Sequence, residues 1–520
     1  AVVAADTREA ARDALRAIRV DYEVLPSVLD IRTAIAPDAP VVFPGRPARD
    51  LPPDRIGKYS NVGAYGRVTW GDVEAGFAAA DVIVEEEYDN PFVSQASLEP
   101  RAAVAAVDAA GKVTVWSNTQ TPFGLRWTLA SLLGLPASMV ALRSPYIGGG
   151  FGGKTPISLE PLAALLALKT GRPVRLANSR REEFYAAFPR PAVLVRIKTG
   201  ATKDGLIVAR QIEAFGDGGT TASGWVGRTA VLALGPYRIP NLLSEAYDIY
   251  TNNFPCGAFR APGAPAAFFA GESNLDSVAK AIGMDPIELR MKNAWRDGDR
   301  AHTGQAVEHA PMEECLRKAR DLIGWEKGPT GPNRGLGIAA GWWQSGPGNS
   351  RVVIALNADG SAQFLTGAVE QGNGSALLGP PLIIAAELGI PPERVEVVRS
   401  GTEGGMQDSG SGGSRVTANL GVATLRAARD LKRQLLDLAA AELKAPVERL
   451  VMEGDAIVDP TTGKRTTVGA LASATYGKGQ LVGTGACSTA AKPYDRVRSI
   501  GSIWGGIANP AYFAQAVEVE

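Results

Sequence analysis

Residues 148–154 read Gly148-Gly149-Gly150-Phe151-Gly152-Gly153-Lys154, with five glycines around one aromatic residue. Glycines this dense serve no packing purpose, but they allow positive φ angles and let the backbone approach a ligand closely. Residues 139–143 are typical of a strand, and residues 161–170 are typical of a helix that is closed by Gly171. A strand, a glycine loop and a helix in this order form an arrangement that holds anions. The structural alternative is a plain cluster of turn glycines.

Residues 148–155 also match the letters GxxxxGK(S/T) of a nucleotide-binding P-loop. The helix of a P-loop begins at the lysine, whereas Pro156 and Pro161 would interrupt a helix at this point. A nucleotide hydrolase also needs an acidic magnesium ligand, and the candidates Asp108 and Asp459 are poorly placed along the chain. A nucleotide titration would test this alternative.

Three more glycine-rich loops lie far apart in the sequence. They are GAFRAPGAP at residues 257–265, EQGNGS at residues 370–375 and SGSGGSR at residues 409–415. Separated glycine loops predict one large, phosphate-bearing ligand that is held by backbone N–H groups from several sides. A nucleotide-binding βαβ unit would place its glycines together. We therefore expect the four loops to share one cavity.

The composition indicates a globular protein, since 520 residues with 45% hydrophobic side chains suffice for sizeable cores, in about three domains. The 54 basic residues balance the 54 acidic ones, which gives no reason to expect nucleic acid or a membrane as partner. A small neutral or amphipathic substrate fits better. The three cysteines and two histidines form no ligand motif, which argues against a protein-ligated zinc or iron site and against redox chemistry on thiols.

The four loops, together with WSNTQ at residues 116–120 and DPIELRMKN at residues 285–293, resemble the molybdenum-binding large subunit of the xanthine oxidase and aldehyde oxidoreductase family of molybdenum hydroxylases. The motifs occur in the family's order over essentially the whole chain. The resemblance implies an α+β (mixed α/β) fold, with a molybdopterin-binding domain of the xanthine oxidase type in two subdomains. We expect the end of an α/β hammerhead domain and a connector at residues 1–60, the first subdomain at 71–325 and the second at 335–520.

Local patterns predict several elements, of which Asp285 with Pro286 and Glu288 gives the strongest helix start. The others are a helix capped by Asp6 or Thr7 and running to Ile18, a strand at 20–25, strands at 352–357 and 362–366 around Asp359-Gly360, helices at 381–388 and 421–443, and an alternating strand at 517–520. Both chain ends are expected to be truncated.

The resemblance implies that the Gln120 amide faces an oxygen ligand of molybdenum and that Phe151 lies against the metal through its backbone. Arg260 is expected to stabilise an oxyanion or the anionic pterin, and Arg228 the negative charge that develops on the substrate. The structural alternatives are a polar strand end for Gln120, a core aromatic for Phe151 and surface arginines for the other two. Gln120, Phe151, Arg260 and Gly413 would surround the metal without a side-chain ligand to it.

Backbone amides and hydroxyls of the loops are expected to bind the molybdopterin, in its cytosine dinucleotide form. The residues assigned to this role are Gly150, Phe151, Gly152, Gly153, Arg260, Gly372, Asn373, Gly374, Gly413, Ser414 and Thr417. Asn373 stands where many members carry glutamine, so a shorter amide must reach the pterin. A serine and glycine linker is the alternative for the loop around Ser414.

The substrate pocket is expected to include Thr155, Pro262, Trp342 and Trp343. In xanthine-oxidising members a glutamate follows the loop lysine and an aromatic follows the FR pair by two residues. Thr155 and Pro262 take these places, which disfavours xanthine and favours an aldehyde or an aromatic heterocycle. The paired tryptophans are aromatic walls or core residues, and Cys256 is interpreted as a buried loop thiol.

The family reaction is hydroxylation with water as oxygen donor, and it needs a glutamate as general base. No matching motif is found, and Glu272 lies in an expected helix, so we name no base and expect no turnover from this polypeptide alone. Electrons must leave to iron-sulfur ([2Fe-2S]) and FAD subunits, as in bacterial relatives, in a hetero-oligomer without a membrane span. A cytoplasmic location is expected, with the periplasm as alternative. The functional alternatives are a catalytically incomplete fragment, a non-catalytic binding subunit of this fold, or a reductive member acting on an aromatic thioester.

Overall fold

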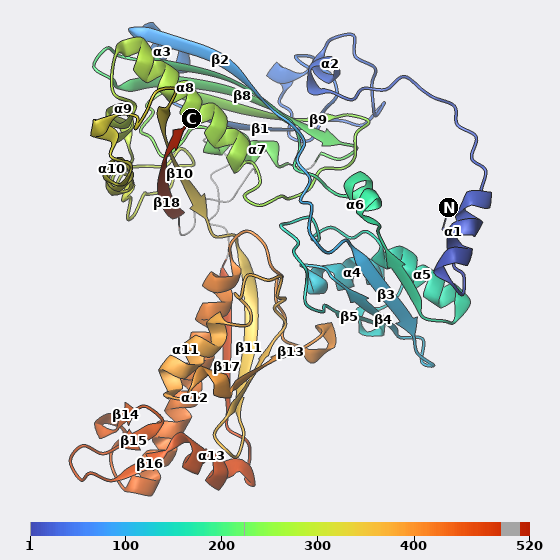
Figure 1. The fold of residues 1–520 in the computed structure, drawn as a ribbon, viewed down its shortest axis with the longest axis vertical. Coiled ribbons are helices and arrows are strands. Elements are labelled where there is room, and N and C mark those ends of the chain that lie inside the picture. The colour runs from blue at the N-terminus through green and yellow to red at the C-terminus, as the bar shows by residue number, and fades with distance from the viewer. Residues whose placement is uncertain (1, 223, 490–509) are drawn as a thin grey trace. The chain divides into compact units, whose positions relative to one another are not determined.

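The computed structural model describes residues 2–222, 224–489 and 510–520. The chain separates into two units that are each assembled from distant stretches of sequence. Unit 1 comprises Ala1–Tyr22, Ala96–Phe184 and Gly346–Ala490, and unit 2 comprises Glu23–Gln95, Tyr185–Ser345 and Ala491–Glu520. Helices and mixed sheets occur in both units, which confirms the predicted mixed α/β class (Figure 1). The division at 1–60, 71–325 and 335–520 stays a prediction.

The strands of the first sheet of unit 1 lie on both sides of the glycine loop at 148–154 in the sequence. Its strands, in the order β5-β4-β3-β6, are β5 (Val140–Arg143), β4 (Val113–Ser117), β3 (Ala102–Val107) and β6 (Val174–Ala177). Helices α4 (Pro122–Leu133) and α5 (Glu160–Thr170) bury alanine and leucine side chains against it, and α6 (Arg180–Ala186) ends the segment. Gly171 ends α5 with φ 65°. The predicted strand before the loop and helix after it are therefore confirmed.

The second sheet of unit 1 lies under two long helices. Its order is β13 (Val395–Arg399), β12 (Ala362–Thr366), β11 (Gly348–Leu356) and β17 (Val482–Thr489). Helices α11 (Gly379–Leu388) and α12 (Val416–Leu443) pack on it, and α13 (Val468–Tyr476) follows the small sheet β14 (Val451–Glu453), β15 (Ala456–Val458), β16 (Arg465–Thr467). Gly485 permits the close approach of α12, because a Cβ there would clash with the Ala423 carbonyl oxygen. The helix predicted at 421–443 begins five residues earlier, since Gly421 lies within it.

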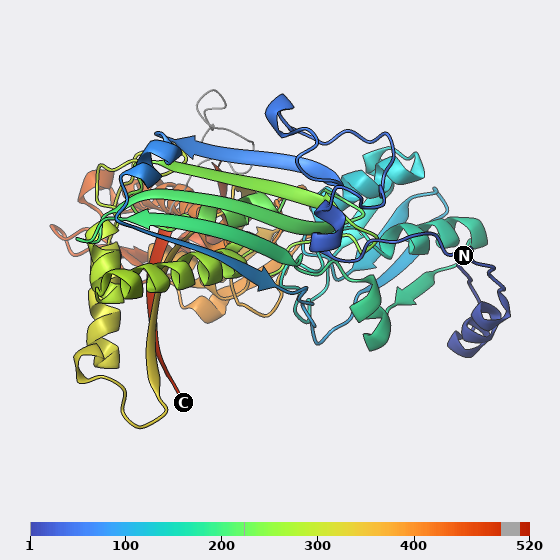
Figure 2. The same cartoon turned by 90° about the horizontal axis from the view of Figure 1, so that it is seen from above.

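A five-stranded sheet forms the centre of unit 2. Its order is β1 (Val62–Trp70), β9 (Leu242–Tyr250), β8 (Ile207–Gly219), β7 (Val193–Ala201) and β2 (Val82–Asn90). Helices α7 (Val226–Leu232) and α8 (Ala264–Ile282) lie along one face of this sheet, as Figure 2 shows for α8. The core between them includes Tyr237, Leu275 and Trp295, while α2 (Ile31–Ile35) and α3 (Val73–Ala78) pack elsewhere on the sheet.

The remainder of unit 2 is a two-stranded antiparallel sheet with two helices. Strands β10 (Gly335–Gln344) and β18 (Pro510–Val519) pair along their whole length, which confirms the predicted alternating strand near the end of the sequence. Helix α9 (Pro286–Asn293) begins at the predicted cap, where Asp285 accepts hydrogen bonds from the N–H groups of Ile287 and Glu288. Helix α10 (Met312–Ile323) packs against β18.

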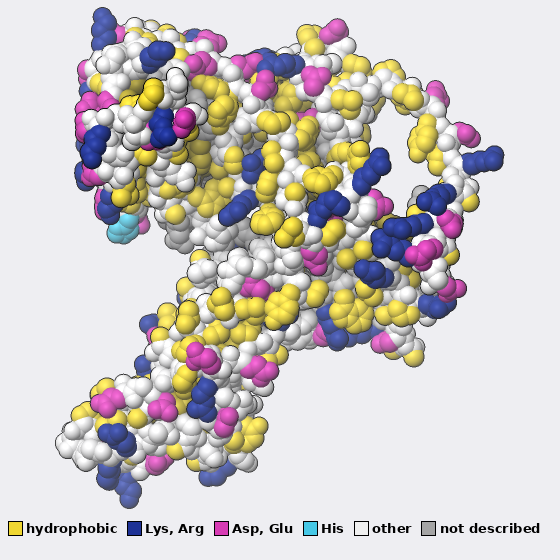
Figure 3. All heavy atoms as spheres, viewed as in Figure 1, with side chains coloured by type: hydrophobic (Ala, Val, Ile, Leu, Met, Phe, Trp, Pro, Cys, Tyr) yellow, Lys and Arg dark blue, Asp and Glu magenta, His cyan; other side chains and the backbone are white. Residues whose placement is uncertain are grey.

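Helix α1 (Arg8–Ala17) contacts the rest of unit 1 through an exposed ion pair at its start rather than through buried side chains. Thr7 caps it by accepting from the Ala10 N–H at 3.1 Å, as predicted, but the helix has no buried residue. Arg172 forms an ion pair with Asp6, and basic side chains gather along α1 and the end of α5 in Figure 3. The strand predicted at 20–25 is wrong, because these residues pair with no neighbouring strand in the described chain and Val24 is 91% exposed.

Among the described residues, no helix combines the length and the apolar character that crossing a bilayer requires.

Asp248 of β9 is a buried acid whose protonation is expected to affect the stability of unit 2. Its pKa is raised to about 7, mainly by burial and in part by the charge of Asp217, while the Gly224 N–H and Arg49 act to lower it. The folded state therefore binds a proton between about pH 4 and 7 that the unfolded state releases, so the free energy of unfolding falls as pH rises through this window. We expect Asp248→Asn to remove this slope and to add roughly 1–3 kcal/mol at pH 8. Chemical denaturation at pH 5 and pH 8 checks this, and a parallel pH profile in wild type and variant would contradict it.

Candidate functional site

The glycine loop at 148–154 folds as a tight, non-helical turn in unit 1. Gly149, Phe151 and Gly152 have φ angles of 85°, 54° and 100°, so the only side chain among them is in the left-handed region. Gly150 cannot carry a side chain, because its Cβ would lie 2.5 Å from the Gln120 Oε1. Helix α5 begins only at Glu160, and the Lys154 Nζ is bonded to Glu99 at 2.7 Å. This geometry disfavours the nucleotide-hydrolase alternative, in which the lysine would meet a phosphate.

Gln120 is a buried amide, 1% exposed, that joins two of the predicted loops. Its Oε1 accepts from the N–H groups of Gly152 at 2.9 Å and Lys154 at 3.3 Å, and its Nε2 donates to the Ser411 carbonyl at 2.8 Å. An amide has two donor hydrogens and two acceptor positions. Three of these four are in use, which leaves one N–H of Gln120 for a hydrogen-bond acceptor.

The loop at 409–415 is shaped by Arg415 and meets Gln120. The Arg415 guanidinium donates to the carbonyls of Ser409 and Gly410, and a Cβ at Gly410 would clash with the Gln120 carbonyl oxygen. Gly413 and Ser414 follow with φ angles of 61° and 59°. They lie at the start of α12, whose N-cap residue makes no side-chain cap hydrogen bond.

The exposed part of this loop has the features of an anion site. Gly413, Ser414 and Thr417 are all exposed, and the N–H groups of the first turn of α12 begin here. A left-handed residue next to a right-handed one, as at Ser414 and Arg415, points successive backbone N–H groups in one direction and creates a concave site for an anion. The predicted cofactor residues of this loop are therefore placed together.

The loop at 370–375 joins the other two, but its glycine amides are already in use. The Glu370 carboxylate accepts from the N–H groups of Gly372 at 2.7 Å and Gly374 at 3.0 Å. The exposed Asn373 accepts from Ser375 within its own turn. The interpretation of Gly372 and Gly374 as ligand-binding amides is therefore disfavoured, since Glu370 occupies the position an external anion would take.

Hydrogen bonds between loops bring three of the four together in unit 1. The Ile147 N–H donates to the Glu370 carbonyl at 3.0 Å, and the Gln371 Nε2 donates to the Ser411 Oγ at 2.9 Å. Thr155 closes the glycine turn, where its N–H donates to Gly152 and its carbonyl accepts from Thr121. The loops at 148–155, 370–375 and 409–415 therefore surround Gln120 and Ser411.

The fourth loop, at 257–265, lies in unit 2 and is held by its carbonyl groups. The Gln95 Nε2 donates to the Ala258 carbonyl at 2.9 Å, and the Arg190 guanidinium donates to the carbonyls of Phe259 at 3.0 Å and Arg260 at 2.8 Å. With these carbonyls facing the protein, the Arg260 side chain is exposed. Among the described residues it has no ion-pair partner.

Arg228 and Trp343 lie beside this loop in unit 2. A Cβ at Gly263 would be 2.7 Å from the Arg228 Cβ, and the Arg228 guanidinium lies 4.6 Å and 5.9 Å from the rings of Trp225 and Trp343. Burial lowers the pKa of Arg228 to about 8, and a nearby anion would act against that shift.

The other residues of unit 2 that were predicted for the site are less well placed to contact a ligand. Trp342 is 4% exposed in the core, which favours the structural interpretation of this residue over a pocket wall. Pro262 is half-buried in the loop itself. Cys256 is a buried loop thiol that donates to the Asp217 carbonyl, as predicted, and burial raises its pKa.

Backbone strain marks three of the four loops. Phe151, Ala261 and Ser414 have φ angles of 54°, 58° and 59° although they carry side chains. Such conformations cost about 1–3 kcal/mol each and persist where the surroundings impose them, often at ligand sites. In unit 1, the strained loops at Phe151 and Ser414 flank the buried Gln120 amide and the N-terminus of α12, and together they define a site for a phosphate-bearing organic cofactor.

Several residues that shape the site were not predicted from the sequence. Glu370 carried a signal, because an acid two residues before a glycine can accept that residue's N–H. Glu99, Arg101 and Arg190 carried none, since the loop residues that they bind lie 49 or more residues away along the chain.

The comparisons with known proteins agree with this class of site. Two models described as molybdopterin cofactor-binding domain match residues 57–294 and 315–520. The chain is 36% identical over 335 residues to the nicotinate dehydrogenase large molybdopterin subunit of Eubacterium barkeri, which covers 63% of this chain and 76% of that subunit. It is 31% identical over 486 residues to a probable xanthine dehydrogenase subunit of Bacillus subtilis, covering 89% of this chain and 62% of the relative.

A solved aldehyde oxidoreductase from Desulfovibrio gigas superimposes with a TM-score of 0.81 at 27% identity, over 99% of this chain and 54% of that one. The chain therefore belongs to the molybdenum-binding large subunits of the xanthine dehydrogenase and aldehyde oxidoreductase family, which are molybdenum-dependent oxidoreductases. This confirms the resemblance and the fold that it implied. The chain spans about six tenths of the xanthine dehydrogenase relative and about half of the aldehyde oxidoreductase.

Proposed function

We propose that this chain is the molybdopterin-binding part of a hydroxylase that oxidises an aldehyde or an aromatic heterocycle with water as oxygen donor. The observation that carries the proposal is the junction of three loops at Gln120, with one N–H of its amide left to donate. A molybdopterin, when bound, would supply a Lewis acid and an electron acceptor. Relatives named for nicotinate and aldehyde support this substrate class.

The chain's own residues suit this role. The exposed residues Gly413, Ser414 and Thr417 would contact pterin or phosphate oxygens at the N-terminus of α12. Arg260 and Arg228 would stabilise negative charge on the cofactor and on the substrate oxygen. Trp343, beside Arg228, would provide an apolar wall, and Thr155 in place of a glutamate would leave a purine without a charged partner.

We propose a cytosine dinucleotide form of the cofactor, [2Fe-2S] and FAD subunits as electron acceptors, and a general base outside residues 1–520. Mild acid hydrolysis of the purified protein should release CMP. The protein's compartment is proposed to be the cytoplasm.

The proposal is tested by purifying the chain from a host that makes molybdopterin. We expect near-stoichiometric molybdenum and pterin, and no turnover of nicotinate-type heterocycles or aldehydes until the iron-sulfur and flavin subunits and the base are supplied. Arg260→Met is expected to lower the pterin content at least about fivefold, because it removes one charged hydrogen bond. Arg317→Met, an exposed arginine of α10, serves as the control. Wild-type protein without molybdenum would support the non-catalytic binding subunit instead, and turnover by this chain alone would contradict the missing base.

A further inference from the structure

The first and last residues of the glycine loop are held by one carboxylate. The Glu99 Oε2 accepts from the Gly148 N–H at 2.8 Å and from the Lys154 Nζ at 2.7 Å. The Glu99 N–H in turn donates to the Gly148 carbonyl at 3.1 Å. A single side chain therefore closes the loop into a ring at its base.

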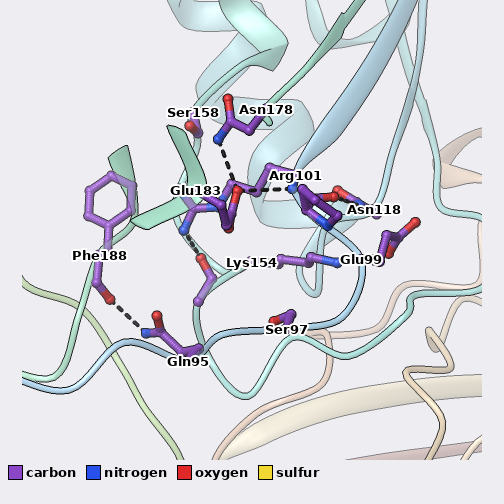
Figure 4. A network of polar contacts seen from close by, with 12 residues as sticks. Gln95, Ser97, Glu99, Arg101, Asn118, Lys154, Ser158, Asn178, Glu183 and Phe188 are labelled. Carbon is purple, nitrogen blue, oxygen red and sulfur yellow. Dashed lines mark hydrogen bonds and ion pairs between the residues drawn. The ribbon is translucent and has the colours of Figure 1, made fainter. Parts of the chain in front are cut away.

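A second charged residue holds the loop just before Lys154. The Arg101 guanidinium donates to the Gly153 carbonyl, and the Arg101 N–H donates to Glu183 at 3.0 Å. Glu183 also accepts from Asn178 at 2.9 Å. Figure 4 shows Lys154 extended toward Glu99, with Arg101 and Glu183 beside each other next to this pair.

The ion pair is buried on one side only, which makes its loss costly. The Lys154 side chain is 2% exposed, and the Glu99 side chain is 36% exposed. Burial lowers the pKa of Lys154; burial also acts to raise the pKa of Glu99, but the hydrogen bonds from Lys154 and Gly148 lower it overall. An ammonium group this deeply buried needs a charged partner, and Glu99 supplies it.

These contacts leave only the tip of the loop without an anchor. Gly152 and Lys154 are fixed through their N–H groups by Gln120. In contrast, the N–H groups of Gly150 and Phe151 donate to no other described residue. The left-handed Phe151 is thus maintained by what surrounds it rather than by its own bonds.

We propose that Glu99 and Lys154 are positioning residues, whose ion pair closes the glycine loop and presents the Gly150 and Phe151 N–H groups to the cofactor. The proposal deepens the proposed function and rests on it. It assigns the loop lysine to a structural pair rather than to a phosphate. Neither side chain touches the reacting atoms, and both act through the backbone of Phe151.

The test combines hydrogen exchange with cofactor content in the full chain. Lys154→Met keeps the aliphatic length and removes the charge, and Glu99→Gln keeps an acceptor for Gly148 while weakening the pair. Lys432→Met in α12 is the matched control, because it removes a surface contact with Glu387 at 3.7 Å. In protein without cofactor, we expect the amides of residues 148–155 to exchange about tenfold faster in Lys154→Met, the effect of a lost charged hydrogen bond.

The same variant should retain several-fold less molybdopterin, while exchange in β11 and β12 stays unchanged. The charge reversal Glu99→Lys with Lys154→Glu should restore both readouts in part. Unchanged loop exchange in both single variants would overturn the proposal. A uniform rise in exchange across unit 1, with no rescue by the reversal, would also overturn it in favour of a general stability role. Because exchange is measured without cofactor, failure of the pair is distinguishable from failure of the proposed function, which wild-type molybdenum content reports.

Discussion

Gln120→Ala is expected to give the largest loss of cofactor among single substitutions in unit 1. The change leaves the N–H groups of Gly152 and Lys154 and the Ser411 carbonyl without their buried partner. Each such group costs about 1–3 kcal/mol when unsatisfied, so the free energy of unfolding should fall by about 3–5 kcal/mol. Because two loops lose their connection, molybdenum content should fall more than about tenfold, the equivalent of about 1.4 kcal/mol in binding.

Chemical denaturation and metal analysis measure the two effects separately. Gln120→Glu is the informative second variant, because a carboxylate still accepts from the two N–H groups but donates nothing to Ser411 or to a ligand. It should therefore lose cofactor with a smaller loss of stability. Gln363→Ala on β12 is the control, because it removes only an exposed hydrogen bond of 3.1 Å to Glu396. Its free energy of unfolding should stay within about 0.5 kcal/mol of the wild-type value. Full molybdenum content in Gln120→Ala would contradict a role of this amide in holding the cofactor.

Glu272→Ala is expected to destabilise unit 2 severely. Glu272 accepts from the Tyr237 hydroxyl at 2.8 Å, the Arg290 Nε at 2.8 Å and the Ala340 N–H at 2.7 Å. Arg290 is fully buried, and burial acts to lower its pKa, but the charges of Glu272 and Asp276 reverse this and raise it. Removing Glu272 takes away the main counter-charge of a buried guanidinium, which costs about 3–5 kcal/mol.

The expected result is a melting temperature lower by roughly 10 °C, measured by calorimetry. Asp276→Asn is the matched control, because it removes the other carboxylate that pairs with Arg290. The Asp276 side chain is 49% exposed, so this change should cost about 1 kcal/mol or less. A stable Glu272→Ala protein that binds molybdenum normally but is inactive in the assembled enzyme would contradict the structural role. It would identify Glu272 as the general base instead.

Local elements were predictable because their signals lie within a few residues. The cap at Asp285, the end of α5 at Gly171 and the turn at Gly360 between β11 and β12 each depend on a neighbouring N–H or on a positive φ angle. The strand at 20–25 failed for a different reason. Alternating apolar and polar residues indicate which face of a strand would be buried. A strand also needs a neighbouring strand to pair with, and no short sequence pattern specifies that neighbour.

The candidate site was predictable as a set of loops but not as a set of contacts. Glycine runs show where the backbone must bend, and three of the four runs meet around Gln120. They do not show that Glu370 fills the amides of Gly372 and Gly374, or that Lys154 faces Glu99. Those outcomes depend on side chains that arrive from distant segments, with burial and charge deciding which partner is taken. The convergence of the fourth loop stays a prediction.

The interleaved make-up of the two units has a practical consequence for dissecting this chain. The chain changes from one unit to the other after Tyr22, Gln95, Phe184, Ser345 and Ala490. A contiguous fragment that contains all of β3, α5 and β11 must therefore include much of the other unit as well. Neither half can be produced by simple truncation. Isolating one would require splicing its stretches through short artificial linkers, and during synthesis the early β3 must wait for the late β11 before the three loops around Gln120 can assemble.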